Sequence, residues 1–167
     1  TSFGGIKGKG VDDAIALFDE RVSAGHRYVA GSDIAGFFTK VKPSSVLTVL
    51  QNDGVHEDFV SLVGAAMKVE LSNIDELDPQ DRKLFPSGDD GVAQGCPLSA
   101  LAGNVALAEF DRTMNDPARG VTCIRYIDDF IITGPSERKV LKAMESAGRR
   151  LADLGMRIYD PDLDPSK

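Results

Sequence analysis

Two adjacent carboxylates, Asp128 and Asp129, interrupt a run that is otherwise almost wholly apolar, CIRYIDDFIITG at residues 123–134. A third carboxylate, Asp33, ends another largely apolar stretch, RYVAGSDI at residues 27–34. Carboxylates held close together repel each other unless a cation lies between them, and their hard oxygen atoms suit Mg²⁺. Such a set could hold two metal ions about 3.5 to 4 Å apart for nucleotidyl transfer.

Two short strands must position the adjacent pair. Residues 121–126 (VTCIRY) and 130–134 (FIITG) are rich in β-branched and apolar side chains, and only three residues separate them. We therefore expect a tight hairpin with the carboxylates at its tip. Aspartate is also common in turns, where its side chain bonds to the backbone, so the hairpin alone does not require a metal.

The faces of these strands predict which carboxylates act together. Because successive side chains of an extended strand point to opposite faces, Tyr126 and Asp128 are expected to share one face and Ile127 and Asp129 the other. Asp33 ends a neighbouring strand, and adjacent strand ends bring such residues together. Asp33 and Asp128 are therefore expected to form the metal platform.

The remaining pattern predicts several helices and one further strand. Apolar residues recur at helical spacing in several stretches, and proline, serine and glycine mark helix ends. Residues 72–91 are the least regular part, where we expect an excursion with a short hairpin. The expected helices span Val11–Ser23, a segment opened by Ser44 or Ser45, Phe59–Met67, Pro97 to about Asn115, and Val140–Leu154, followed by a short strand at residues 156–159.

The order of these elements predicts the fold class. Strand, helices, strand, strand, helix, strand is the split βαβ arrangement of ferredoxin-like α+β folds. A length of 167 residues favours one compact unit.

Composition narrows the class of protein. The net charge is −7, which argues mildly against a nucleic-acid binder held by bulk electrostatics. No apolar run approaches the roughly 20 residues of a membrane-spanning helix, so we expect no membrane partner. Cys96 and Cys123 form no metal-type spacing, which favours a reduced, cytoplasmic setting. His26 and His56 lie in polar surroundings, and we interpret both as surface residues without a partner.

Three motifs resemble those of reverse transcriptases, in the same order and at comparable spacing. They are D-I-x-x-F-F at residues 33–38, Q-G-C-P-L-S at 94–99 and Y-I-D-D at 126–129. The sequence GNVALAEFD at residues 103–111 resembles the bacterial enzymes of group II introns, retrons and diversity-generating retroelements. One such motif is weak, but three ordered motifs on a compatible fold are specific.

The resemblance implies a polymerase palm with part of the fingers over residues 1–167, an RNA-directed DNA polymerase that adds dNTPs to a DNA or RNA primer on an RNA template. It implies two Mg²⁺ ions, with Mn²⁺ as a substitute, held by Asp33, Asp128 and the backbone of Ile34, with Asp129 in support. The residues implied to contact the nucleotide or primer end are Phe38, as a steric gate against ribose, and Gln94, Gly95 and Tyr126. Phe37 is expected to be a core aromatic.

Some features depart from the family or leave alternatives open. Ala93 and Ala100 stand where the family commonly has proline, and the basic upstream fingers and the thumb are absent, so we expect an excerpt of a longer protein. Lys167 could match the lysine near the leaving pyrophosphate or be a solvated residue. An RNA-dependent RNA polymerase, a nucleotide cyclase and a silent RNA-binding or scaffold domain stay as alternatives. The oligomeric state and the owning retroelement or defence system do not follow from the sequence.

Overall fold

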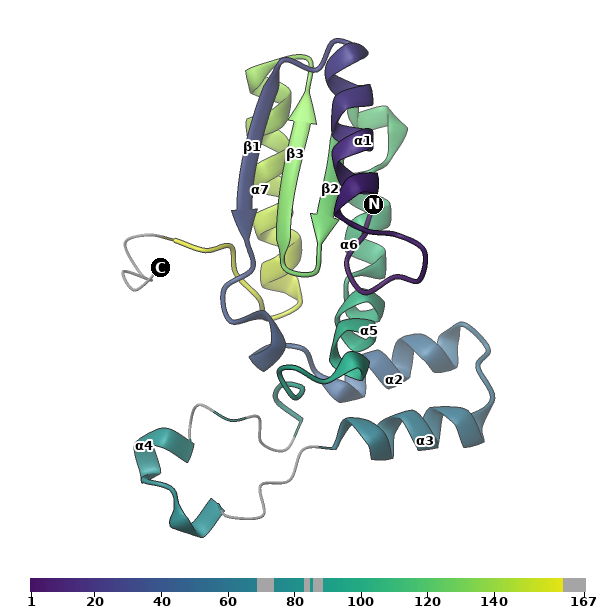
Figure 1. The fold of residues 1–167 in the computed structure, drawn as a ribbon, viewed down its shortest axis with the longest axis vertical. Coiled ribbons are helices and arrows are strands. Elements are labelled where there is room, and N and C mark those ends of the chain that lie inside the picture. The colour runs from purple at the N-terminus through teal and green to yellow at the C-terminus, as the bar shows by residue number, and fades with distance from the viewer. Residues whose placement is uncertain (69–73, 83–84, 86–88, 161–167) are drawn as a thin grey trace. The chain divides into compact units, whose positions relative to one another are not determined.

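The sheet is the element that carries the three carboxylates. The computed structural model describes residues 1–68, 74–82, 85 and 89–160, and shows a mixed α+β fold with a three-stranded antiparallel sheet (Figure 1). The length of the chain predicted one compact unit, but the structure divides into two. They are Thr1–Ala35 with Leu107–Lys167, and Gly36–Ala106, and each is described by itself.

The sheet of the first unit has the strand order β1-β3-β2. Its strands are β1 (Tyr28–Asp33), β2 (Thr122–Tyr126) and β3 (Asp129–Gly134). The central strand β3 pairs with both neighbours, so Phe130 and Ile132 are buried. The predicted hairpin and the strand before Asp33 are confirmed.

Short segments extend both edges of this sheet. Ser2 forms a parallel bridge with Arg125 on the outer edge of β2, and Ile158 forms an antiparallel bridge with Ile34, just beyond the end of β1. The strand predicted over residues 156–159 is therefore a single bridge rather than a strand. The physical reason is that the chain turns at Gly36, which has a φ of 60°, so no extended partner continues past Ala35.

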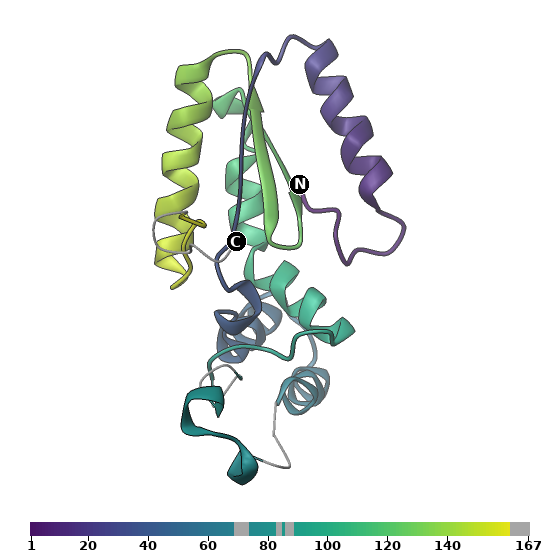
Figure 2. The same cartoon turned by 60° about the vertical axis from the view of Figure 1, so that its left-hand side comes forward.

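Helices cover both faces of the sheet. Figure 2 shows α1 (Val11–Ser23) on one face, and α6 (Ala108–Met114) and α7 (Glu137–Asp153) on the other. The predicted helix of α7 is confirmed, and a short 3-10 turn, η3 (Pro117–Arg119), precedes β2. The side chains that α7 buries are Val140, Ala143, Ala147 and Leu151.

The bounds predicted for α1 are confirmed, but its apolar stripe is not a core face. No residue of α1 is buried, and Val11 and Ile15 are 54% and 53% exposed. His26, which follows α1, was predicted to lie on the surface without a partner, and this was wrong. Its Nδ1 lies 2.7 Å from the hydroxyl of Thr133, whose side chain is fully buried.

The single helix predicted from Pro97 to about Asn115 is two helices. They are α5 (Pro97–Ala106), in the second unit, and α6, which begins after Leu107. The sequence before the break, Gly103–Asn104–Val105, consists of weak helix formers, and Leu107 is fully buried. The free energy gained by burying Leu107 therefore outweighs the free energy gained by continuing a weak helix through this position.

The second unit is built from helices. Its other elements are η1 (Phe37–Thr39), α2 (Pro43–Asn52), α3 (Glu57–Met67), η2 (Ile74–Glu76) and α4 (Pro79–Arg82). Helices α2, α3 and α5 pack against one another. Helix α3 starts two residues before the predicted Phe59, because the imidazole of His56 accepts from the amide of Asp58 and caps it.

Other predictions concern the start of α2, the segment 72–91 and membrane-spanning helices. Helix α2 starts at Pro43 rather than Ser44 or Ser45, since proline is favoured in the first turn. The hairpin predicted within residues 72–91 lies partly outside the described residues, and the described part of that segment contains η2 and α4. None of the described helices is long and apolar enough to cross a membrane.

Candidate active site

The turn between β2 and β3 consists of Ile127 and Asp128. Ile127 has a φ of 60°, and in the described chain it is the one residue other than glycine with a positive φ. A positive φ at the first of two turn residues is the pattern of a type II′ hairpin turn, which normally places glycine there. A β-branched residue in this conformation costs about 1 to 3 kcal/mol, so the surrounding structure must hold it.

A buried arginine stabilises this turn through a hydrogen bond. The side chain of Arg125 is 0% exposed, and its Nη1 donates a hydrogen bond to the carbonyl oxygen of Ile127 at 2.5 Å. Its Nε and Nη2 donate to the two carboxylate oxygens of Asp111, on α6, at 2.9 and 2.6 Å. This two-point pairing satisfies the charge of Arg125 and fixes the direction of its third contact, to the turn.

The N-terminal segment packs against the same turn. A Cβ atom added to Gly4 would lie 2.7 Å from Cγ1 of Ile127 and 2.8 Å from its amide nitrogen, closer than such atoms approach. The amide of Phe3, beside it, donates to the carbonyl of Arg125 at 2.9 Å. Glycine at position 4 therefore lets the backbone pack directly on Ile127.

The structure brings Asp33 to the same end of the sheet as the hairpin carboxylates. Asp33 is the register partner of Asp129, and the amide of Ile34 donates to the carbonyl of Asp128 at 3.1 Å. Residues directly opposite each other on antiparallel strands have Cβ atoms about 4.5 to 5.5 Å apart and share a face. The end of β1 and the hairpin turn are therefore tied together through both pairing and main chain.

The predicted assignment of faces was wrong. Tyr126 is the register partner of Asp129, so Tyr126, Asp129 and Asp33 share one face of the sheet. The prediction carried strand alternation through Ile127 and Asp128, but these two residues form the turn, and alternation does not continue through a turn. Phe130 and Arg125 point to the opposite face, toward α6, where the ring of Phe130 packs edge-on against Phe110.

The charges of Asp128 and Asp129, which are adjacent in the chain, repel each other. Partial burial raises the pKa of Asp129, and the neighbouring charge of Asp128 raises it further. A cation would offset this repulsion, and Mg²⁺ binds through one or two carboxylates and completes its shell with water and phosphates. Asp129 shares a face with Asp33 and Asp128 lies in the turn, so a cation bound here would lie where β1 ends and β3 begins. Among the described residues, no group of three or more His, Cys, Asp or Glu side chains is arranged to hold a metal.

The remaining residues of the first unit have defined positions. Tyr126 is 41% exposed beside the carboxylates, so its ring is open to a ligand. Ile34 is 1% exposed, and its amide is engaged in the hydrogen bond to the carbonyl of Asp128. Lys167 lies outside the described residues.

Phe38, Gln94 and Gly95 lie in the second unit. Phe38 is half-buried, with its ring centroid 5.3 Å from that of Phe37. Phe37 is 2% exposed, which confirms it as a core aromatic. The amide of Val92 donates to the carbonyl of Phe38 at 2.8 Å and so joins this residue to the segment before Gln94.

Gln94 and Gly95 form an exposed turn before α5. Gly95 has a φ of 85°, a conformation that favours glycine. The hydroxyl of Ser99 donates to the carbonyl of Ala93 at 2.5 Å and fastens this turn to the start of α5. A cavity of about 230 Å³ adjoins it and is lined in part by Ala93 and Ser99.

Sequence reasoning missed the pair Asp111–Arg125. The available signal was an arginine inside the apolar strand CIRY, because a buried arginine requires a charged or hydrogen-bonding partner. Asp111 had been noted only as part of the GNVALAEFD resemblance.

Comparison with known proteins bears on the family and the fold. Residues 2–160 match the family described as "Reverse transcriptase (RNA-dependent DNA polymerase)". No curated protein matches the chain.

Among solved structures, a telomerase from Candida albicans, in complex with a TWJ fragment of telomeric RNA, is 12% identical with a TM-score of 0.54. The match covers 95% of this chain and 32% of the telomerase chain. A chain of a partial Cas6-RT-Cas1–Cas2 complex is 22% identical over 89% of this chain and 25% of its own, with a TM-score of 0.36. The telomerase likeness shows the fold alone, and this chain spans about a third of its length.

Proposed function

This chain belongs to the reverse transcriptase family, and we propose that it catalyses RNA-directed DNA synthesis by adding dNTPs to a primer on an RNA template. The observation that carries the proposal is the placement of Asp33, Asp128 and Asp129 at one end of the sheet, where Asp33 ends β1 and the other two lie at a hairpin turn held in a strained conformation. Strain of this kind is maintained where surrounding structure over-determines it, often at active sites.

The sheet supports a ferredoxin-like palm as the finer description. The bridge of Ile158 with Ile34 adds a fourth segment beside β1, and β3 and β2 follow on the other side. This order, with helices between the strands, is that of the split βαβ arrangement. In this proposal the second unit is part of the fingers, and the resemblance of the GNVALAEFD sequence supports the bacterial kind of reverse transcriptase.

The carboxylates of Asp33 and Asp128 would hold Mg²⁺, with the backbone of Ile34 and Asp129 in support. Bound there, two such ions would stabilise the negative charge of a nucleotide's phosphates and of the attacking primer oxygen. The chain's own contribution is positional. Arg125 and Gly4 fix the turn, the pairing of β1 with β3 sets Asp33 beside it, and the exposed ring of Tyr126 offers a surface for the primer end.

Phe38 is proposed to exclude ribonucleotides, with Gln94 and Gly95 contacting the incoming nucleotide or the template. A bulky aromatic gate favours DNA over RNA synthesis and so separates this function from that of an RNA polymerase. The ring of Phe38 packs against the buried ring of Phe37, and this contact limits how far the Phe38 ring can move.

Primer extension on an RNA template by the full-length protein tests this function. We expect extension with dNTPs and little with rNTPs, and we expect Phe38→Ala to increase rNTP use relative to dNTP use. Phe85→Ala is the control, because it removes an exposed aromatic ring that has no proposed role in the gate. Absence of dNTP extension would contradict the proposed activity, and an unchanged preference in Phe38→Ala would contradict the gate.

A further inference from the structure

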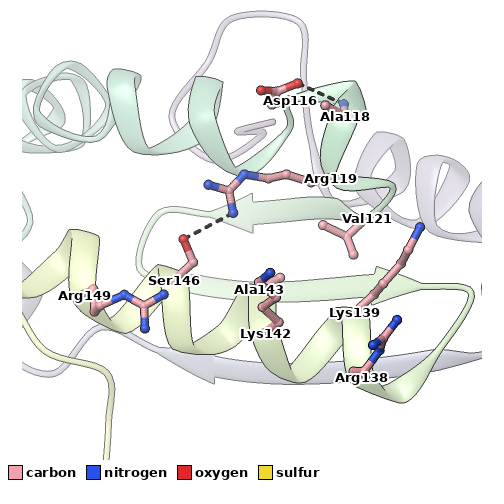
Figure 3. A pocket seen from close by; sticks show the side chains of 10 residues that line it. All are labelled: Asp116, Ala118, Arg119, Val121, Arg138, Lys139, Lys142, Ala143, Ser146 and Arg149. Carbon is pink, nitrogen blue, oxygen red and sulfur yellow. Dashed lines mark hydrogen bonds between the residues drawn. The ribbon is translucent and has the colours of Figure 1, made fainter.

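A second charged feature of the first unit lies on the face of the sheet opposite the carboxylates. A cavity of about 670 Å³ lies between η3 and α7 (Figure 3). Its cationic side chains are Arg119, at the end of η3, and Arg138, Lys139, Lys142 and Arg149, all on α7. We call this feature the α7 cavity.

The charge of the α7 cavity opposes that of the protein. Five of the chain's 19 Lys and Arg residues line it, although the net charge of the chain is −7. Asp116 is the one acidic residue of the lining, and its carboxylate accepts from the amide of Ala118 at 2.9 Å, as the cap of η3. Cations gathered in an acidic protein form a local positive potential that attracts anions.

The cations of the α7 cavity are not neutralised within the described part of the chain. No described carboxylate lies within 4.0 Å of their nitrogen atoms, and Arg119 donates instead to the hydroxyl of Ser146 at 3.2 Å. Four of the five side chains are exposed. Holding these charges together is unfavourable without a counter-charge, so the arrangement suits an anionic ligand.

The spacing of the cations suits an extended anion. Arg138 and Arg149 are eleven residues apart on one helix, which corresponds to about 16 Å of helix axis. Arg119 adds a cation from the facing segment, as Figure 3 shows. A run of cations of this length could contact several phosphates of a nucleic-acid backbone.

The lining favours contact with a phosphate backbone rather than with bases. None of its ten residues, all within the described chain, is aromatic, so the α7 cavity offers no surface on which bases could stack. Arginine and lysine are the usual ligands of phosphate oxygens. The nucleic-acid substrates implied by the family make RNA a better partner than an acidic protein.

The α7 cavity is separate from the carboxylate site. The side chains of Asp33 and Asp129 face away from α6 and α7. Val121, which lines the cavity, lies just before Thr122, at the end of β2 farthest from Tyr126. A nucleic acid in the α7 cavity would therefore occupy a different place from one at the carboxylates.

We propose that the α7 cavity binds the sugar–phosphate backbone of double-stranded RNA at a second site, apart from the site of synthesis. This inference rests on the proposed function for its choice of nucleic acid as partner. A second backbone site would hold a folded part of an RNA on the protein while another part is copied.

Binding of a labelled 20-base-pair RNA hairpin to the full-length protein tests this proposal, with anisotropy measured over a series of KCl concentrations. The pair Arg138→Gln and Lys142→Gln, both exposed, removes two cations from the α7 cavity. The matched control pair, Arg27→Gln and Arg112→Gln, removes two exposed cations elsewhere. We expect the cavity pair to weaken binding at least tenfold and to lower the slope of log K against log salt by about two, with little change in the control.

Three outcomes would overturn the proposal. One is an equal loss of affinity in the two pairs, and another is an unchanged salt dependence in the cavity pair. The third is displacement of the hairpin by polyglutamate as efficiently as by unlabelled RNA duplex, which would assign the α7 cavity to an acidic protein. Because hairpin binding is measured without dNTPs, it does not require synthesis. A protein that binds the hairpin through the α7 cavity but does not extend a primer would contradict the polymerase assignment alone.

Discussion

Breaking the pair Asp111–Arg125 should both destabilise the protein and disturb the hairpin turn. Arg125 is 0% exposed, whereas the carboxylate of Asp111 is 15% exposed. Asp111→Leu leaves a buried guanidinium without its carboxylate partner, while the hydrogen bond to the carbonyl of Ile127 stays. Arg125→Leu leaves a partly hydrated carboxylate and removes the donor to that carbonyl.

These differences in burial determine how much each substitution should lower the free energy of unfolding. Removing one partner of a buried ion pair costs about 3 to 5 kcal/mol, because the other charge stays buried and unpaired. We expect Asp111→Leu at the upper end of that range and Arg125→Leu at the lower end, because Asp111 retains some contact with water. The double variant should cost less than the sum of the two by about 3 kcal/mol, since it leaves no buried charge.

Urea-induced unfolding measures these costs. With a slope near 2 kcal/mol/M, a loss of 4 kcal/mol lowers the midpoint by about 2 M. Arg112→Leu, with Glu109→Leu, is the control pair, because this exposed ion pair on α6 should contribute less than about 1 kcal/mol. Additive effects in the Asp111–Arg125 cycle, or a single substitution that costs less than 1 kcal/mol, would refute this account of the turn.

Three further predictions concern other parts of the first unit and the two cysteines. Gly4→Ala should lower the rate of primer extension and destabilise the fold, since its Cβ would lie 2.8 Å from the backbone nitrogen of Ile127. Gly10→Ala controls for the loss of a glycine, because Gly10 has an extended φ of −146° and its added Cβ would meet only Oδ2 of Asp13 at 4.0 Å; equal effects would contradict the contact. Burial raises the pKa of Cys123 to about 12, so iodoacetamide at pH 8 should modify half-buried Cys96 and leave Cys123 unmodified until urea is added; modification of the native Cys96→Ser protein would show this to be wrong. Burial, followed by the charge of Arg21, lowers the pKa of His26, so its neutral form is favoured in the folded state. That contribution to stability is complete above the unfolded pKa of about 6.5 and is lost as the pH falls below it, so the urea midpoint should fall less between pH 8 and pH 5 in His26→Gln than in the unaltered protein.

Local patterns in the sequence predicted local structure well. The helical spacing of Val140, Ala147 and Leu151 predicted α7, and the β-branched runs around residues 126–129 predicted the hairpin. These signals are sufficient because a buried helical stripe and a two-residue turn depend on neighbours in sequence.

Features that depend on distant residues could not be predicted in the same way. The two residues of the ion pair Asp111–Arg125 come from different elements, and nothing in the spacing of either indicates the other. The stripe of α1 has helical periodicity, yet its burial depends on what covers it. The α7 cavity could not be predicted from the negative net charge of the chain, because net charge does not reveal where cations gather.

The central claim is that the carboxylates at the hairpin turn perform DNA synthesis on RNA. The most direct measurement is the rate of dNTP incorporation on an RNA template by the full-length protein and its Asp128→Asn variant, with Asp153→Asn as an exposed control on α7. The account predicts a loss of at least a hundredfold in Asp128→Asn, equivalent to about 2.7 kcal/mol or more of transition-state stabilisation, and a normal rate in Asp153→Asn. Incorporation by Asp128→Asn at the rate of the unaltered protein would contradict it.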